Sequence, residues 1–185
     1  MTEQTTQKKY ELLKDDTVEH FGRTLYRIKA LITFGLVGAG QLGGYIETEK
    51  NLDHSGNAWV YDNTRVYGNA MVYGNARVFG NAWMCGNARV CAHAWVYGNA
   101  RVFGNAWVRS FAVISERKMI FWASNVGSEN GTLTVFNGKF GLIVTRGCFT
   151  GTVDEFLSKS KEVHDDKTHH EYKLLIEVAQ SRILN

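Results

Sequence analysis

Two residues of this 185-residue chain are candidates for catalysis, His93 and Cys148. His93 replaces the asparagine of a recurring Gly-Asn pair, within CAHAWV, and an imidazole there could remove a proton from a hydroxyl or an amine near neutral pH. Cys148, in RGCFTG, could act as a nucleophile with His164 or His170 as its base. The sequence fixes no partner for either residue. We therefore expect a tolerated corner substitution at 93, a small buried thiol at 148, and a protein that is not an enzyme.

A group of mostly polar residues from Arg117 onward is harder to explain by packing. A glycine-rich link leads into a predicted helix at Thr152, and the N–H groups of a helix N-terminus suit an anion, with Arg146 supplying positive charge. The alternative is that these side chains only cap turns and the helix. We predict a small anionic, nucleotide-like ligand, without any metal or cofactor, at these residues: Arg117, Trp122, Ser128, Asn130, Thr132, Arg146, Thr150 and Asp154.

A cluster near the C-terminus contains residues that could bind a metal ion: His164, Asp165, His169, His170 and Glu171. On a helix, the adjacent His169 and His170 point apart, and His164 and His169 share a face poorly. A solvated helix face is therefore the better prediction than a metal site.

The elements that position these residues begin with a strict six-residue repeat. Each copy holds a short strand, Ala-x-Val-aromatic, and then a Gly-Asn corner, whose residues tolerate left-handed backbone. Strand side chains alternate between faces, so Ala and Val point to one side and the other two residues point away. A period this regular predicts a coil. Nine copies run from 55 to 108: SGNAWV, YDNTRV, YGNAMV, YGNARV, FGNAWM, CGNARV, CAHAWV, YGNARV and FGNAWV.

Outward-facing residues should form ladders if three copies complete one triangular turn, because residues 18 apart then stack. The ladders alternate arginine with a mostly indole neighbour, which provides cation–π contacts of about 0.5–1 kcal/mol each. They are Trp59–Arg77–Trp95, Arg65–Trp83–Arg101 and Met71–Arg89–Trp107, followed by Tyr61–Phe79–Tyr97, Tyr67–Cys85–Phe103 and Tyr73–Cys91–Arg109. Such surfaces can stack nucleobases or be buried against another surface.

Three regions follow from the repeat. Residues 1–54 form an N-terminal cap. It begins with a polar, frayed segment, 1–9, and continues with two strands within 10–31, of which 25–31 is an edge strand. Degenerate copies of the repeat follow, before a two-residue phase shift at 53–54. Residues 55–126 form the coil, because RSFAVI, SERKMI and FWASNV stay in phase. Residues 127–185 form an α+β domain with a hairpin turn near Asn137-Gly138 and two helices, from Thr152 to about 163 and roughly 167–183.

The GNA-x-V-aromatic array resembles the left-handed parallel β-helix of hexapeptide-repeat proteins, and the hand of the coil is implied by that resemblance alone. Many such proteins are acyltransferases with a histidine general base, a role that would fall to His93, and many are trimers. We favour the ladders as a trimer interface, or as a surface covered by the C-terminal unit, with these interface residues: Trp59, Arg77, Trp83, Trp95, Arg101 and Trp107.

Three segments also resemble phage and prophage proteins: the leader GQLGGYIETEKNLDHSGNAWV, the array, and the C-terminal motif GSENGTLT with GCFTGTVDEF. The resemblance implies a phage-type binding protein that sequesters a host signal or blocks a host defence component. Acyltransferase and virion or scaffold protein are the alternatives. Glu129 stands where that motif is often basic, and Asp165-Asp166 replaces a Gly-Asp pair.

The composition limits the remaining classes. A net charge of +3 is too small for a dedicated, sequence-specific nucleic-acid binder. The three cysteines lack metal-type spacing, which fits a reducing cytoplasm. No apolar run is long enough for a membrane span, and no leader peptide is evident. We expect a mainly β, cytoplasmic protein without a membrane segment.

Overall fold

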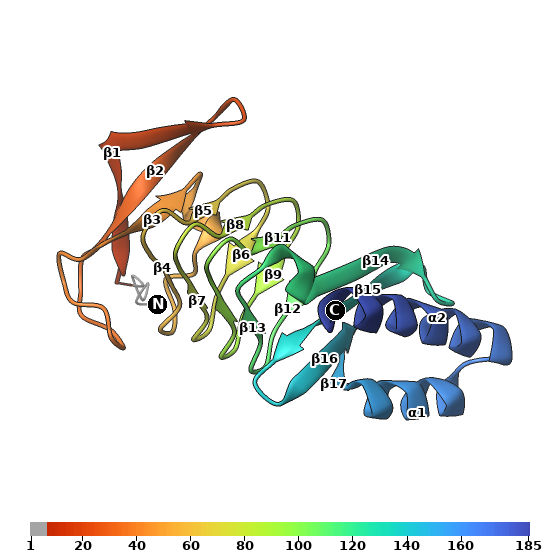
Figure 1. Cartoon of the computed structure of the whole chain (residues 1–185). Coiled ribbons are helices and arrows are strands. Elements are labelled where there is room, and N and C mark those ends of the chain that lie inside the picture. Colours follow the sequence, from red (N-terminus) through yellow and green to blue (C-terminus); the bar gives the residue numbers. More distant parts are fainter. Residues whose placement is uncertain (1–6) are drawn as a thin grey trace, which may run out of the picture.

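Each copy of the repeat forms one two-residue strand and one corner in the computed structural model, which describes residues 7–185. The strands stack into three parallel sheets around a β-solenoid of about four turns (Figure 1). The register pairs Trp59 with Arg77 and Arg77 with Trp95, and the other two sheets repeat this 18-residue offset. The predicted coil and its ladders are confirmed, and the left hand stays a prediction. The strands are β4 (Trp59–Val60), β5 (Arg65–Val66), β6 (Met71–Val72), β7 (Arg77–Val78), β8 (Trp83–Met84), β9 (Arg89–Val90), β10 (Trp95–Val96), β11 (Arg101–Val102), β12 (Trp107–Val108) and β13 (Val113–Ile114).

The inward Ala and Val side chains of the copies are buried and form one continuous core. The glycine of the corner has positive φ, for example 70° at Gly74. Ala92 holds the same corner position with a φ of 57°, in a region that disfavours a Cβ. The corner of CAHAWV is therefore strained at the residue before His93.

Replacing Ala92 by glycine should raise the free energy of unfolding by about 1 kcal/mol, because the left-handed penalty exceeds the entropy that glycine loses on folding. Chemical denaturation measures the change. The reverse variant, Gly74→Ala, should be destabilised, since its Cβ would lie 3.2 Å from the Ala92 nitrogen. Equal stability of both variants and the parent would contradict this explanation of the corner.

The N-terminal cap is an antiparallel hairpin of β1 (Tyr10–His20) and β2 (Arg23–Ala30), continued by β3 (Leu42–Ile46) and a short 3-10 helix, η1 (Glu49–Asn51). The two predicted strands are confirmed. The prediction of an edge strand at 25–31 is wrong, because β2 lies between β1 and β3, and β1 is the edge. Ile46 pairs with Val66 and Leu52 with Val72, offsets of 20 residues that confirm the phase shift before residue 55.

The segment predicted to be frayed includes Lys9, and there the prediction is wrong. Lys9 is buried, and its ammonium group donates to the Ala58 carbonyl at 2.9 Å and lies over the Phe34 ring. Burial lowers the Lys9 pKa to about 8, against an opposing attraction from Asp53. Residues 1–6 of the frayed segment lie outside the described residues.

Lys9 should make stability depend on pH. Between about pH 8 and pH 10 the unfolded chain keeps the Lys9 proton while the folded chain releases it, so the free energy of unfolding should rise with pH across this window. Above pH 10 the raised pKa of buried Tyr10 acts in the opposite direction. Urea unfolding at a series of pH values should show the rise in the parent and lose it in Lys9→Met. An identical slope in both proteins would exclude Lys9 as its source.

The C-terminal unit is a four-stranded antiparallel sheet with two helices packed on it (Figure 1). The coil does not extend to residue 126 as predicted. Its last parallel pair is β10 with β13, and a 3-10 turn (η2, Arg117–Met119) then redirects the chain into β14 (Ile120–Val126), which pairs antiparallel with β15 (Gly131–Gly138). Ile120 is apolar at the inward position of the repeat because its side chain packs against the end of the coil core. The elements are β14 (Ile120–Val126), β15 (Gly131–Gly138), β16 (Gly141–Arg146), β17 (Phe149–Thr152), α1 (Val153–Val163) and α2 (Asp166–Ile183), so the hairpin turn and both helices are confirmed.

Candidate ligand site on the solenoid

The indole ladders are largely covered within this chain. Trp59 is 0% exposed, because the Tyr10 and Phe34 rings pack edge-on against it at 6.0 and 5.4 Å. Trp83 lies under His20 of the N-terminal hairpin, with ring centroids 4.4 Å apart. The prediction that Trp59 belongs to a subunit interface is therefore wrong, since the N-terminal cap already occupies that surface.

Trp107 and Arg101 also have contacts within this chain. Arg101 stacks on Trp83 at 4.2 Å, and Arg109 stacks on Trp107 at 4.2 Å. The Trp107 backbone accepts from Thr145 and donates to Thr134 of the C-terminal sheet. The C-terminal unit thus covers part of the ladder surface as predicted, at the end of the coil near Trp107.

Trp95 is the exception, with 46% of its surface exposed. It lies on the sheet of β4, β7, β10 and β13, whose outward side we call the open face. On this face Phe34 packs against Trp59, and Leu36 of the same loop lines a cavity beside Arg77 and Trp95. Arg77, one rung before Trp95, places its guanidinium 5.8 Å from the Trp95 ring centroid.

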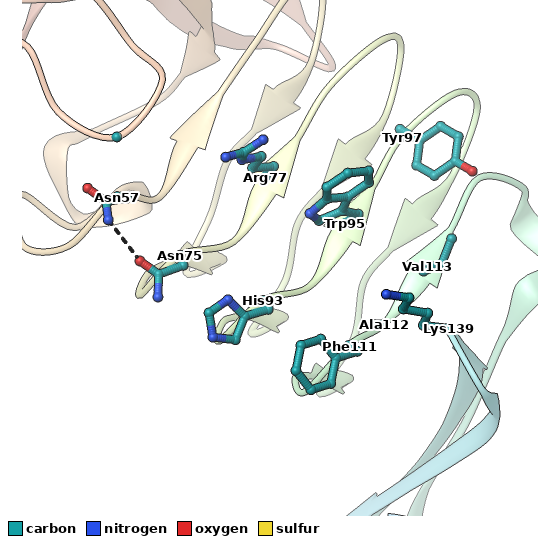
Figure 2. A pocket seen from close by; sticks show the side chains of 11 residues that line it. Asn57, Asn75, Arg77, His93, Trp95, Tyr97, Phe111, Ala112, Val113 and Lys139 are labelled. Carbon is teal, nitrogen blue, oxygen red and sulfur yellow. Dashed lines mark hydrogen bonds between the residues drawn. The ribbon is translucent and has the colours of Figure 1, made fainter.

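A cavity of about 720 Å³ lies on the open face around Trp95 (Figure 2). Its basic groups are Arg77 and Lys139, and Lys139 comes from the β15–β16 hairpin, where its backbone N–H donates to the Phe111 carbonyl at 2.9 Å. No carboxylate of the described residues lines it. The lining residues are Gly35, Asn57, Asn75, Arg77, His93, Trp95, Tyr97, Phe111, Ala112, Val113 and Lys139.

His93 gives this cavity an aromatic wall. At one corner of the coil, Asn69, Asn87 and Asn105 form an unbroken ladder of side-chain hydrogen bonds. At the corner beside the open face the ladder stops after Asn57 and Asn75, which are bonded at 3.1 Å. His93 then stacks parallel on Phe111, with ring centroids 5.4 Å apart and planes 10° apart (Figure 2). None of the ion pairs found among residues 7–185 involves His93.

The eight residues predicted to bind the ligand are not gathered in one cavity. Arg146 donates to the Tyr172 hydroxyl at 2.9 Å and approaches Glu129 at 3.5 Å. Trp122 packs against Phe103 at the end of the coil. Of the others, Arg117 lies in η2, Ser128 and Asn130 in the turn after β14, Thr132 in β15, and Thr150 and Asp154 beside the start of α1.

The helix N-terminus expected to bind an anion is already capped. Thr152 accepts from the Glu155 N–H at 3.2 Å, and Glu155 accepts from the Thr152 N–H at 2.7 Å. These bonds lower the Glu155 pKa, so a carboxylate already occupies this end of α1. Capping therefore accounts for Thr152 and Glu155 at this end of α1. The adjoining depression has three carboxylates, from Asp154, Glu155 and Glu162, against the one ammonium group of Lys159, so it is acidic.

Cys148 is exposed, so the expectation of a buried thiol is wrong. It shares a cavity of about 360 Å³ with His164, and His170 does not line that cavity. His169 bonds the buried Ser160 hydroxyl at 3.2 Å. In the described part of the chain, no group of three His, Cys, Asp or Glu residues is placed to hold a metal ion.

The family model described as YdcK Beta solenoid repeat matches residues 64–75, 72–86 and 94–110. These matches and the stacked parallel sheets make the chain a β-helix repeat protein that carries a C-terminal α+β unit. A search of the curated proteins gives no match. Among residues 7–185, no helix has the length and apolar character needed to cross a membrane.

Proposed function

We propose that this chain is a non-enzymatic binding protein that holds a small anionic, nucleotide-like ligand on the open face. The observation that carries the proposal is the exposed Trp95, bordered by Arg77 and Lys139 in a cavity that no carboxylate of residues 7–185 lines. The N-terminal cap covers Trp59 and Trp83, whereas Trp95 stays available to a ligand.

The chemistry of the cavity suits a nucleotide. An exposed aromatic ring stacks any nucleobase, because every base has a π-face. Arginine and lysine form the strong charge-assisted hydrogen bonds that phosphate accepts. A volume of about 720 Å³ lies in the range typical of small-molecule sites.

Calorimetric titration with adenosine 5′-monophosphate tests the site. Arg77→Ala should weaken binding about tenfold or more, because a hydrogen bond to a charged group is lost. Arg89→Ala is the matched control: Arg89 is a ladder arginine on another sheet, 5.7 Å from the Trp107 ring, and its loss should leave affinity unchanged. Equal effects of the two variants, or no binding by the parent, would exclude this site.

The biological role we propose is sequestration of a host nucleotide signal, or occupation of a host defence component, in the cytoplasm of an infected cell. The resemblance of the array and the C-terminal motif to phage proteins supports it. Mass spectrometry of small molecules released from protein purified from infected cells should detect a nucleotide. Recovery of the chain in purified virions would instead support the structural role.

One observation favours a second candidate, an acyltransferase. His93 is exposed and lines the cavity together with the cationic Lys139, so it could act as a general base toward a bound acceptor. This candidate requires acyl-coenzyme A turnover that disappears in His93→Ala. A protein that does not bind coenzyme A would eliminate it.

A trimer remains our proposal for the assembly. Met71 in β6 and Phe103 directly after β11 lie outside the open face and are more than two-fifths exposed, and such apolar side chains favour association. Sedimentation equilibrium should give three times the chain mass, and a monomer at micromolar concentration would rule the trimer out.

A further inference from the structure

A second cavity adjoins the first on the open face. It has a volume of about 350 Å³ and is lined by Leu36, Tyr61, Asp62, Arg77, Phe79 and Trp95. Arg77 and Trp95 line both cavities. The first cavity extends from the corner that holds His93 across Trp95 to Tyr97, and the second lies on the Tyr97 side, around Asp62. The open face therefore has two lobes that share Arg77 and Trp95.

Each lobe offers an aromatic surface. In the first, His93 and Phe111 form the stacked wall beside Trp95. In the second, Phe79 meets Trp95 edge-on at 6.3 Å and stacks on Tyr97 at 4.9 Å, and Tyr61 also lines this lobe. The guanidinium of Arg77 thus lies between two places where a planar ring can stack.

The charges differ between the lobes. Asp62 is the acidic residue of the second lobe, and one of its carboxylate oxygens accepts from the Gly80 N–H at 2.9 Å. A second anionic group would be repelled there, whereas amino or hydroxyl groups of a neutral nucleoside can donate to a carboxylate. The first lobe is lined by Lys139, whose positive charge favours an anionic group there.

We propose that the ligand is a dinucleotide, two bases joined through phosphate, with the linking phosphate at Arg77 and one base in each lobe. This inference rests on the proposed function and specifies the ligand class of the same site. A mononucleotide has one base and would fill one lobe only. The two lobes beside the Arg77 guanidinium provide stacking positions for two bases, so they favour a dinucleotide. Linear and cyclic dinucleotides share this chemistry.

Calorimetry with three probes tests the inference: adenosine 5′-monophosphate, the 3′,5′-linked diadenosine monophosphate, and its cyclic diadenylate counterpart. The linear probe carries less charge than the mononucleotide, so a charge-only site would bind it more weakly. A two-lobed site should bind it, or the cyclic probe, about tenfold more tightly, since a second stacked base adds affinity. The tighter of the two identifies the linear or the cyclic class.

Tyr61→Ala removes an aromatic side chain of the second lobe alone, and Tyr73→Ala is its control at the same repeat position on another sheet. Tyr61→Ala should weaken dinucleotide binding about tenfold and leave mononucleotide binding within twofold. Mononucleotide binding without any gain for either dinucleotide would overturn this inference and leave the proposed function standing. A failure of all three probes to bind would overturn both.

Discussion

Replacing Trp59 by alanine is expected to lower the free energy of unfolding by about 3 kcal/mol. Trp59 is the largest fully buried side chain, and truncating a buried tryptophan typically costs about 3–5 kcal/mol. Its indole N–H is buried and has no hydrogen-bond partner among residues 7–185, and removal of that unsatisfied donor places the loss near the lower end. Tyr10 and Phe34 also lose the ring against which they pack, so the N-terminal cap should loosen.

Chemical denaturation followed by circular dichroism measures the loss. Trp95→Ala is the control from the same ladder, and its stability should change by less than about 1 kcal/mol, because surface substitutions have small effects. A similar loss in both variants would contradict the different burial of the two indoles.

Replacing Trp95 by alanine should instead weaken nucleotide binding by about 10- to 100-fold, because the variant loses the aromatic ring on which the base stacks. The variant also removes the ring that the Arg77 guanidinium contacts, so the guanidinium becomes less well positioned to bind phosphate. Calorimetry with adenosine 5′-monophosphate gives the change in affinity.

Phe103→Ala is the matched control for exposure, because Phe103 is 44% exposed and directly follows β11, a strand of another sheet of the coil. Its affinity should equal that of the parent. A comparable loss in Phe103→Ala would indicate nonspecific stacking on any exposed aromatic residue.

The solenoid was predictable because its signal is local and repeated. The hexad fixes which side chains point inward, and the 18-residue ladders follow from three copies per turn, as the pairing of Trp59 with Arg77 confirms. The end of the coil was not predictable from phase alone. Ile120 keeps its apolar position, but β14 pairs with β15 rather than with β11, and competition between two pairing partners is not visible in a periodic pattern.

The candidate site was only partly predictable. Arg77, His93 and Trp95 were singled out by the repeat, whereas the grouping of Arg117, Arg146 and their neighbours did not form. Which indole stays exposed depends on where Phe34 and His20 pack, and these long-range contacts leave no local pattern. Lys139 was missed for the same reason, although its place beside the predicted turn was a signal that the side chain would be exposed.

The most direct test of the ligand site is nuclear magnetic resonance of the indole N–H groups, one signal for each of the five tryptophans. The Trp95 signal is assigned by its absence in Trp95→Ala. On addition of adenosine 5′-monophosphate, that signal should shift while those of the covered Trp59 and Trp83 stay in place. An unshifted Trp95 signal at saturating nucleotide would contradict a ligand on the open face.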